Sequence, residues 1–282
     1  MKQTFLGKLG LFSLILTLFF TASAAAQDYV VVTPADPEGW SADGSTLGGS
    51  VSFEHDEDAP RGIGALELTT NDDPAAKANY MLMFEPYDLA DVTDLSYYTK
   101  TNSASFAEGA PSYQLSVCLE GYNADTETCT GFTTLVFEPY WNPDQGPVTF
   151  DEWLYWDVDA GQFWSTRTYT GDGACAVTAG AGGPPLYTLS TLQTNCPNAE
   201  VYAIAVNVGS NNTDYDTMVD LVQFDDTIYD FEPYEVPTDM AQCKGMGWRH
   251  VRMPDGSMFR NQGQCVSYVV RTYPPGERTG KQ

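Results

Sequence analysis

Basic side chains are scarce in this sequence. Thirteen lysines and arginines stand against 38 aspartates and glutamates in 282 residues, a formal net charge of −25. A chain this acidic repels phosphate backbones, so nucleic acid is not expected as a partner. The acidity fits cation binding, a salty habitat or plain solubility.

Catalytic signatures are also missing. The chain has two histidines, His55 and His250, and it has neither a G-x-S-x-G nor an H-E-x-x-H motif. Nucleophilic and zinc hydrolases need such groups to activate a nucleophile or a water. We therefore predict no catalytic residue, and we expect both histidines in solvated loops.

Long apolar runs are absent outside the first 26 residues. Lys2 and Lys8 precede an uncharged apolar stretch over 9–20, and small residues end at Ala26. This order is typical of a secretory signal peptide, and the stretch is too short to span a bilayer. We predict cleavage near Ala26 and a secreted protein, periplasmic or extracellular, that does not span a membrane.

The sequence has six cysteines and no Cys-x-x-Cys pair, which argues against a metal site. In an exported chain all six can be oxidised, and six cysteines allow 15 connectivities. The most economical hypothesis joins sequence neighbours, namely Cys118 with Cys129, Cys175 with Cys196, and Cys243 with Cys265.

Sustained helical periodicity is absent after the signal, apart from a short candidate helix over 188–194. Polar and apolar residues alternate in many short segments between turn-rich stretches, as in half-buried strands. The predicted strands include 65–68, 95–99, 113–117, 133–137, 153–158, 163–167, 202–208 and 219–224. The sequence therefore predicts an all-β fold, a two-sheet antiparallel β-sandwich of the jelly-roll kind.

The tetrapeptide FEPY occurs three times, at 84–87, 137–140 and 231–234. Proline cannot donate a ladder hydrogen bond, so each copy is expected to mark the end of a strand. The third copy predicts the exit from the sandwich. The expected organisation is a signal peptide (1–26), a sandwich (27–234), a linker (235–240), a basic cysteine unit (241–273) and a disordered tail (274–282).

The charge reverses in the last 42 residues, where basic residues outnumber acidic ones. So short a unit needs a covalent staple, so we predict a β-hairpin closed by Cys243 and Cys265. It either packs against the acidic body and caps the final strand or contacts anionic cell-surface polymers. The tethered opposite charge favours packing.

The segments GIGALEL (62–68), TTLVFEP (133–139), QCK (242–244), GW (247–248) and FRNQGQCVS (259–267) carry a family resemblance. The chain resembles secreted bacterial proteins of unassigned activity that join a galactose-binding-like or jelly-roll body to a short cysteine hairpin. The resemblance implies a fold and an export route. It does not indicate any activity.

Aromatic residues are plentiful. Exposed rings stack on sugars, whereas buried rings only fill a core. Tyr140 and Trp141 follow a strand end and precede a polar turn, so together with Trp164 they are the predicted ligand-binding residues, with a glycan or cell-surface polymer as the partner. The alternatives are a carbohydrate hydrolase with paired carboxylates, with candidates Glu85, Glu138 and Glu152, and an envelope-associated protein without a small ligand.

Asp220 lies on the same strand face as Val222 and Phe224, where an uncompensated carboxylate is costly. Either hydrogen bonds or a cation must compensate it. In galactose-binding-like domains, which this chain resembles, a late-strand acid shares a structural calcium with an early loop. The resemblance implies a Ca²⁺ site in which Asp220 joins Asp43 or Asp72, from the loops 43–49 and 71–73.

Overall fold

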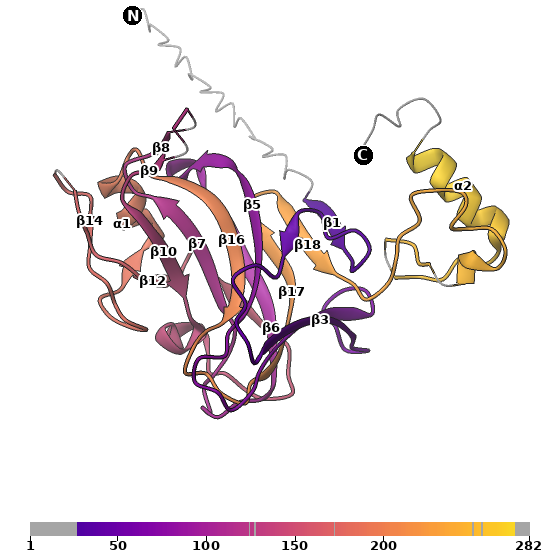
Figure 1. Ribbon diagram of the computed structural model, residues 1–282, viewed down its shortest axis with the longest axis horizontal. Helices are drawn as coiled ribbons and strands as arrows, with labels where there is room; N and C mark the ends of the chain where they lie inside the picture. Colours follow the sequence, from indigo (N-terminus) through magenta and orange to yellow (C-terminus); the bar gives the residue numbers. More distant parts are fainter. Residues whose placement is uncertain are drawn as a thin grey trace, which may run out of the picture.

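The computed structural model describes residues 27–273 except 124, 127, 172, 250 and 255. The predicted signal peptide, His250 and the predicted disordered tail lie outside the described residues. The described part forms the predicted two-sheet β-sandwich, with two seven-stranded sheets facing each other (Figure 1).

The first sheet is built around one long strand, β17, which pairs with β6 along one edge and with β4 and β18 along the other. The outer strand β1 pairs with β18 in parallel, an exception to the antiparallel prediction. Its strands are β1 (Asp28–Val32), β3 (Gly49–His55), β4 (Gly64–Thr70), β6 (Leu95–Ser103), β11 (Leu154–Asp157), β17 (Asp216–Phe224) and β18 (Thr227–Phe231).

The second sheet is antiparallel throughout. In spatial order its strands are β15 (Tyr187–Thr188), β12 (Gln162–Ser165), β10 (Phe132–Phe137), β7 (Ser112–Cys118), β16 (Glu200–Val208), β5 (Ala78–Asp88) and β2 (Trp40–Ser41). Short elements complete the described chain: η1 (Leu89–Asp91), β8 (Tyr122–Asn123), β9 (Thr128–Cys129), η2 (Pro139–Trp141), η3 (Pro143–Gln145), β13 (Tyr169–Thr170), β14 (Ala176–Val177), α1 (Leu189–Asn195), η4 (Gly247–Arg249) and α2 (Gln262–Thr272).

The core lies between the sheets and follows from side-chain alternation. In β7, Tyr113 and Leu115 are buried in the core while Gln114 points to the other face. Because successive side chains of a strand point to opposite faces, the same rule places Asn207 of β16 on the outer face and Val206 in the core. The outer face of the second sheet therefore presents polar side chains above a sealed core.

The FEPY repeats behave in two ways. The second and third copies follow the prediction, because β10 ends at Phe137 and β18 ends at Phe231. The first copy is different, since it lies inside β5. The register of β5 against β16 shifts there, so that Phe84, Glu85 and Pro86 face a single residue. Within this bulge the proline interrupts the ladder without ending the strand.

The cysteines pair as sequence neighbours. The disulfides are Cys118–Cys129, Cys175–Cys196 and Cys243–Cys265, and no cysteine is free. The first two staple loops at the ends of β7 and α1, and the third closes the C-terminal unit. Three disulfides are compatible with an oxidising, extracytoplasmic location.

The C-terminal unit is not the predicted β-hairpin. Cys265 lies in α2, a helix of 11 residues, and strand pairing in this unit is limited to isolated bridges. The cap explains the helix: the Asn261 side chain accepts a hydrogen bond from the Gln264 backbone N–H at 2.9 Å. The side chain of Gln264 in turn accepts from the N–H of Arg260 at 2.7 Å.

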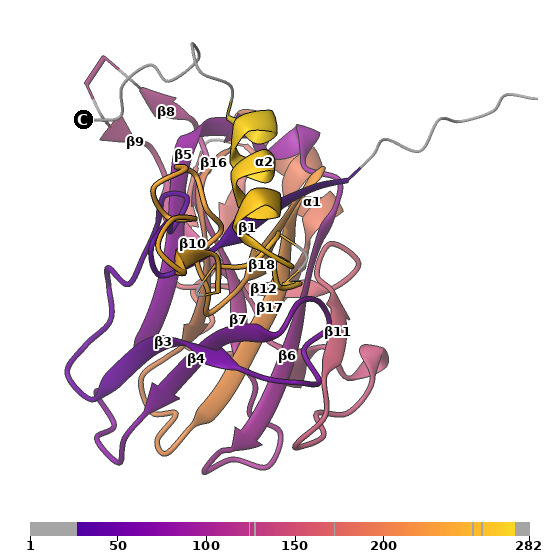
Figure 2. The ribbon, with the colours of Figure 1, turned by 90° about the vertical axis from the view of Figure 1, so that its right-hand side faces the viewer.

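This C-terminal unit (241–273) has its own small core, formed by Cys243, Val251, Phe259, Cys265 and Val269. It lies beside β1 and β18, on the opposite side of the sandwich from β10 and β12 (Figure 1), and Figure 2 shows it face-on. It docks through the backbone: Arg252 N–H donates to the Glu235 carbonyl at 2.9 Å. Of the helices within the described ranges, none has the length and apolarity that crossing a membrane requires.

Candidate functional site

A cavity of about 470 Å³ opens on the outer face of the second sheet, where β10 and β16 end. This volume is within the range of about 300–1,000 Å³ typical of ligand sites. Its floor comes from residues of β7, β12 and β16 that point away from the core. Loops around 106–110, 181–182 and 209–215 form its walls.

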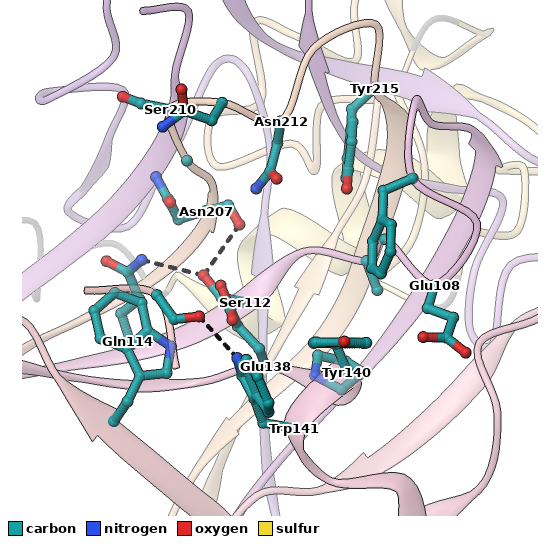
Figure 3. A pocket seen from close by; sticks show the side chains of 18 of the residues that line it. Glu108, Ser112, Gln114, Glu138, Tyr140, Trp141, Asn207, Ser210, Asn212 and Tyr215 are labelled. Carbon is teal, nitrogen blue, oxygen red and sulfur yellow. Dashed lines mark hydrogen bonds between the residues drawn. The ribbon is translucent and has the colours of Figure 1, made fainter. Parts of the chain in front are cut away.

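Aromatic rings form one wall. Tyr140 and Trp141 pack edge to face with centroids 4.6 Å apart, and Phe106 packs against Tyr140 at 5.1 Å. Tyr140 is 41% exposed and Phe106 is 44% exposed, so both rings are available to a ligand. Figure 3 shows Ser210, Asn212 and Tyr215 across the cavity from Tyr140 and Trp141.

The second FEPY copy and the residue after it, Trp141, position this wall. Glu138 is extended and Pro139 opens the 3-10 turn η2, in which the Trp141 N–H donates to the Glu138 carbonyl at 3.0 Å. The Trp141 indole Nε1 donates to the Gly182 carbonyl at 2.9 Å. A Cβ on Gly183 would lie only 2.6 Å from the indole ring, so the close approach of this loop requires glycine.

Glu138 lies at the base of the aromatic wall and is largely buried. Burial raises the pKa of its carboxyl group to about 7, although the indole groups of Trp164 and Trp141 favour the ionised form. Tyr215 is 3% exposed, and burial, with a smaller contribution from the charge of Glu138, raises its pKa to about 12. The site therefore holds a carboxylate that changes charge near neutral pH.

Polar groups cover the floor. The Gln114 side-chain Nε2 donates to the Ser112 hydroxyl at 3.1 Å, and that hydroxyl donates to the Asn207 carbonyl at 3.1 Å. The Asn207 amide donates to the Ala78 carbonyl at 3.0 Å, which fixes the side chain. These groups are fixed by hydrogen bonds and offer donors and acceptors beside the aromatic rings.

The three predicted ligand-binding residues, Tyr140, Trp141 and Trp164, all line this cavity. Their binding role stays a prediction. Sequence reasoning missed Phe106, Asn212 and Tyr215, which reach the cavity from loops distant in the sequence. The outward polar alternation in β7 and β16 was the available signal for Gln114 and Asn207.

The hydrolase candidates do not converge. Glu138 lines the cavity, whereas Glu85 is exposed on β5 and Glu152 is exposed after β10, and neither lines it. The second carboxylate of the cavity is Glu108, which is exposed. His55 is exposed as predicted, but it is the last residue of strand β3 and not part of a loop, and it does not line the cavity.

Asp220 is fully buried among other acids. Its Oδ1 accepts the Phe231 N–H at 3.0 Å, and its pKa is raised well above the ordinary value by burial and by the charge of Asp230. Asp230 pairs with Arg61 at 2.9 Å, and Glu232 accepts the Ile63 N–H at 3.1 Å. Hydrogen bonds and an arginine thus satisfy part of this buried acid cluster, while Asp220 Oδ2 and Asp230 Oδ1 are buried without a hydrogen-bond partner.

The predicted partners of Asp220 in a calcium site lie elsewhere. Asp43 and Asp72 are exposed in loops. Asp216 pairs with Thr69, and Asp220 is four residues further along β17, so about 13 Å of strand separates it from the end of β4 that leads to Asp72. No group of three or more His, Cys, Asp or Glu in the described ranges could hold a metal. Calcium binding, and the pairing of Asp220 with Asp43 or Asp72, stay predictions.

Neither a known protein family nor a curated protein matches the sequence. Solved structures do match. The family 11 carbohydrate-binding module of the cellulosomal cellulase Lic26A-Cel5E of Clostridium thermocellum is 12% identical, with a TM-score of 0.38 over 70% of this chain and 91% of that one. A family 11 module of the same organism in complex with a β-1,3-1,4-mixed-linked tetrasaccharide is 14% identical, with a TM-score of 0.37 over 69% and 91%.

Proposed function

We propose that this protein is an exported, non-catalytic carbohydrate-binding protein whose glycan binds in the cavity beside Tyr140 and Trp141. The observation that carries the proposal is the combination, in one cavity, of exposed aromatic rings with held polar side chains. The apolar faces of sugar rings stack on aromatic side chains, and their hydroxyl groups need nearby donors and acceptors.

A second cavity supports a ligand longer than one sugar. This cavity of about 380 Å³ shares Tyr140 and Trp141 with the first and is lined also by Pro143, Pro147 and Val148. Because both cavities are lined by the two rings, a chain of sugars can extend from one cavity into the other. This arrangement supports an oligosaccharide or polysaccharide as the ligand.

The test is a glycan array followed by titration of any bound glycan against two variants. Trp141→Ala removes the larger ring and is expected to weaken binding by about tenfold or more, since one ring stacked on a ligand contributes about 1–3 kcal/mol. Tyr155→Ala is the matched control, because Tyr155 is 52% exposed on β11 and lies outside the cavity. Tyr140→Ala repeats the test at an exposed position.

An array without a bound glycan would contradict the proposal. Equal affinity of Trp141→Ala, Tyr140→Ala and the unaltered protein would contradict it as well.

The properties of Glu138 favour glycoside hydrolysis as a second candidate function. A carboxyl group with a pKa of about 7 suits a general acid, and Glu108 supplies a second carboxylate in the same cavity. If the protein is a hydrolase, incubation with the glycan shortens it, and the Glu138→Gln variant does not. A binding protein leaves the chain length unchanged.

A further inference from the structure

The charge of the glycan-binding cavity is one-sided. Two carboxylates, Glu108 and Glu138, line it, and its lining includes no lysine, arginine or histidine within the described ranges. Glu138 lies at the base of the aromatic wall and is largely buried, so its negative charge is costly without a positive partner.

The few basic residues of the sandwich are placed elsewhere. Arg61 pairs with Asp230 at 2.9 Å, and Lys100 pairs with Asp56 at 2.8 Å. Arg167 lies over the Phe132 ring at 4.7 Å, and Lys77 is outside the cavity lining. No described cation of this chain therefore neutralises Glu138.

The aromatic wall favours a cation for a second reason. The faces of tryptophan, tyrosine and phenylalanine rings attract positive charge. Trp141, Tyr140 and Phe106 stand at the same cavity as Glu138, and the whole chain carries a net charge of −25. The ring faces, the cavity carboxylates and the negative electrostatic potential of the whole chain all favour a positively charged ligand.

We propose that the glycan bound in this cavity carries protonated amino groups, and that Glu138 receives one of them as an ion pair walled by the Trp141 and Tyr140 rings. The inference rests on the proposed function and names its ligand class, glycans with free amino sugars. A neutral glycan offers Glu138 hydroxyl or amide N–H donors without a positive charge, and an acidic glycan brings a like charge.

The experiment titrates the full mature chain at pH 7 with two probes of equal length, a glucosamine tetrasaccharide and its fully N-acetylated counterpart. The pair differs in charge at the amino groups and in the acetyl caps. We expect the amine form to bind about tenfold or more tightly, because hydrogen bonds to charged groups contribute more than neutral ones.

Two variants separate the ion pair from general attraction to an acidic protein. Glu138→Gln is expected to abolish most of the preference for the amine form. Glu85→Gln makes the same charge change at an exposed position outside the cavity and is expected to keep it. Trp141→Ala is expected to lower the affinity for both probes.

Equal affinity for the two probes, or a preference that survives Glu138→Gln, overturns the inference. If Trp141→Ala nevertheless weakens glycan binding in that case, the proposed function is still supported and only the preference for amino sugars is wrong. A preference lost equally in Glu85→Gln also overturns it, because general charge then explains the effect. Absence of binding by every glycan overturns both proposals.

Discussion

Two carboxylate environments in this protein differ in what surrounds them. The acid cluster of Asp220, Asp230 and Glu232 is fully buried, and Arg61 and backbone N–H groups partner it in part, since Asp220 Oδ2 and Asp230 Oδ1 have no hydrogen-bond partner. Glu138 is also largely buried, yet it has aromatic neighbours, no described cation, and an opening to solvent. Burial raises the pKa values at both places. The first environment carries a compensating arginine within the fold, whereas the second leaves Glu138 facing a cavity without a described cation.

The largest effect is expected from Arg61→Ala, which removes the one described cation paired with the acid cluster. Asp230 is fully buried, whereas the Arg61 side chain is 35% exposed. Breaking a buried ion pair costs about 3–5 kcal/mol, and partial exposure lowers this to about 2–3 kcal/mol. Urea unfolding measures the loss, while glycan affinity stays unchanged.

Arg61→Lys is the control for this change. It keeps the positive charge and should recover part of the lost stability. If Arg61→Ala were as stable as the unaltered protein, the cluster would not depend on its arginine.

Stability should fall as the pH rises from about 5 to 8. The pKa values of Asp230, Glu138 and Glu232 are raised by burial to about 6, about 7 and about 8, above their ordinary values near 4. Over this window the folded state holds protons that the unfolded state has released, so each deprotonation favours unfolding. One pKa unit corresponds to about 1.4 kcal/mol, so we expect Tm to drop by about 5 °C or more.

A Tm that rises or stays level between pH 5 and 8 would contradict the raised pKa values. Asp56 has the opposite pH dependence. Burial alone would raise its pKa, but its hydrogen bond and ion pair with Lys100 outweigh burial, so the pKa of Asp56 is lowered. The stability it contributes is therefore present above its unfolded pKa and disappears as the pH falls further.

A smaller effect is expected from Glu138→Gln, and it sharpens the comparison. At pH 8 the glutamine removes a charge from a largely buried site, so Tm should rise by about 2–4 °C. At pH 5 the native carboxyl is already protonated, so the two proteins should melt together. Differential scanning fluorimetry at both pH values measures this, and a rise at pH 5 alone would contradict the account.

The smallest effect on the cavity is expected from the double variant Cys243→Ser and Cys265→Ser. It opens the C-terminal unit, which has a core separate from that of the sandwich. Hydrogen exchange should increase in residues 241–273, while glycan affinity and sandwich protection stay unchanged. Loss of glycan affinity would show that the cavity depends on this unit.

The fold could be predicted from the sequence where one local pattern decides the structure. Alternation predicts β7 and β16, because each has one buried face. The C-terminal helix was missed because the valines around Cys265 favour strands, whereas Asn261 and Gln264 form a cap whose spacing could have indicated a helix.

The candidate site was only partly predictable. Tyr140 and Trp141 follow a recognisable strand end, so the exposure of Tyr140 could be inferred, whereas Trp141 is half-buried. Phe106 and Tyr215 meet them from loops far apart in the chain, and no local pattern encodes that meeting. The predicted calcium acids depend on the same kind of information, because Asp43 and Asp72 belong to loops whose distance from Asp220 is set by strand register.

The most direct measurement observes the indole N–H signals in an NMR titration with a bound glycan. Trp141 and Trp164 line the cavity, whereas Trp156 is 1% exposed in the core and Trp248 belongs to the C-terminal unit. The account predicts that the Trp141 and Trp164 signals shift with one common affinity while those of Trp156 and Trp248 stay fixed. Shifts confined to Trp248, or none at the two cavity tryptophans while the glycan binds, would contradict it.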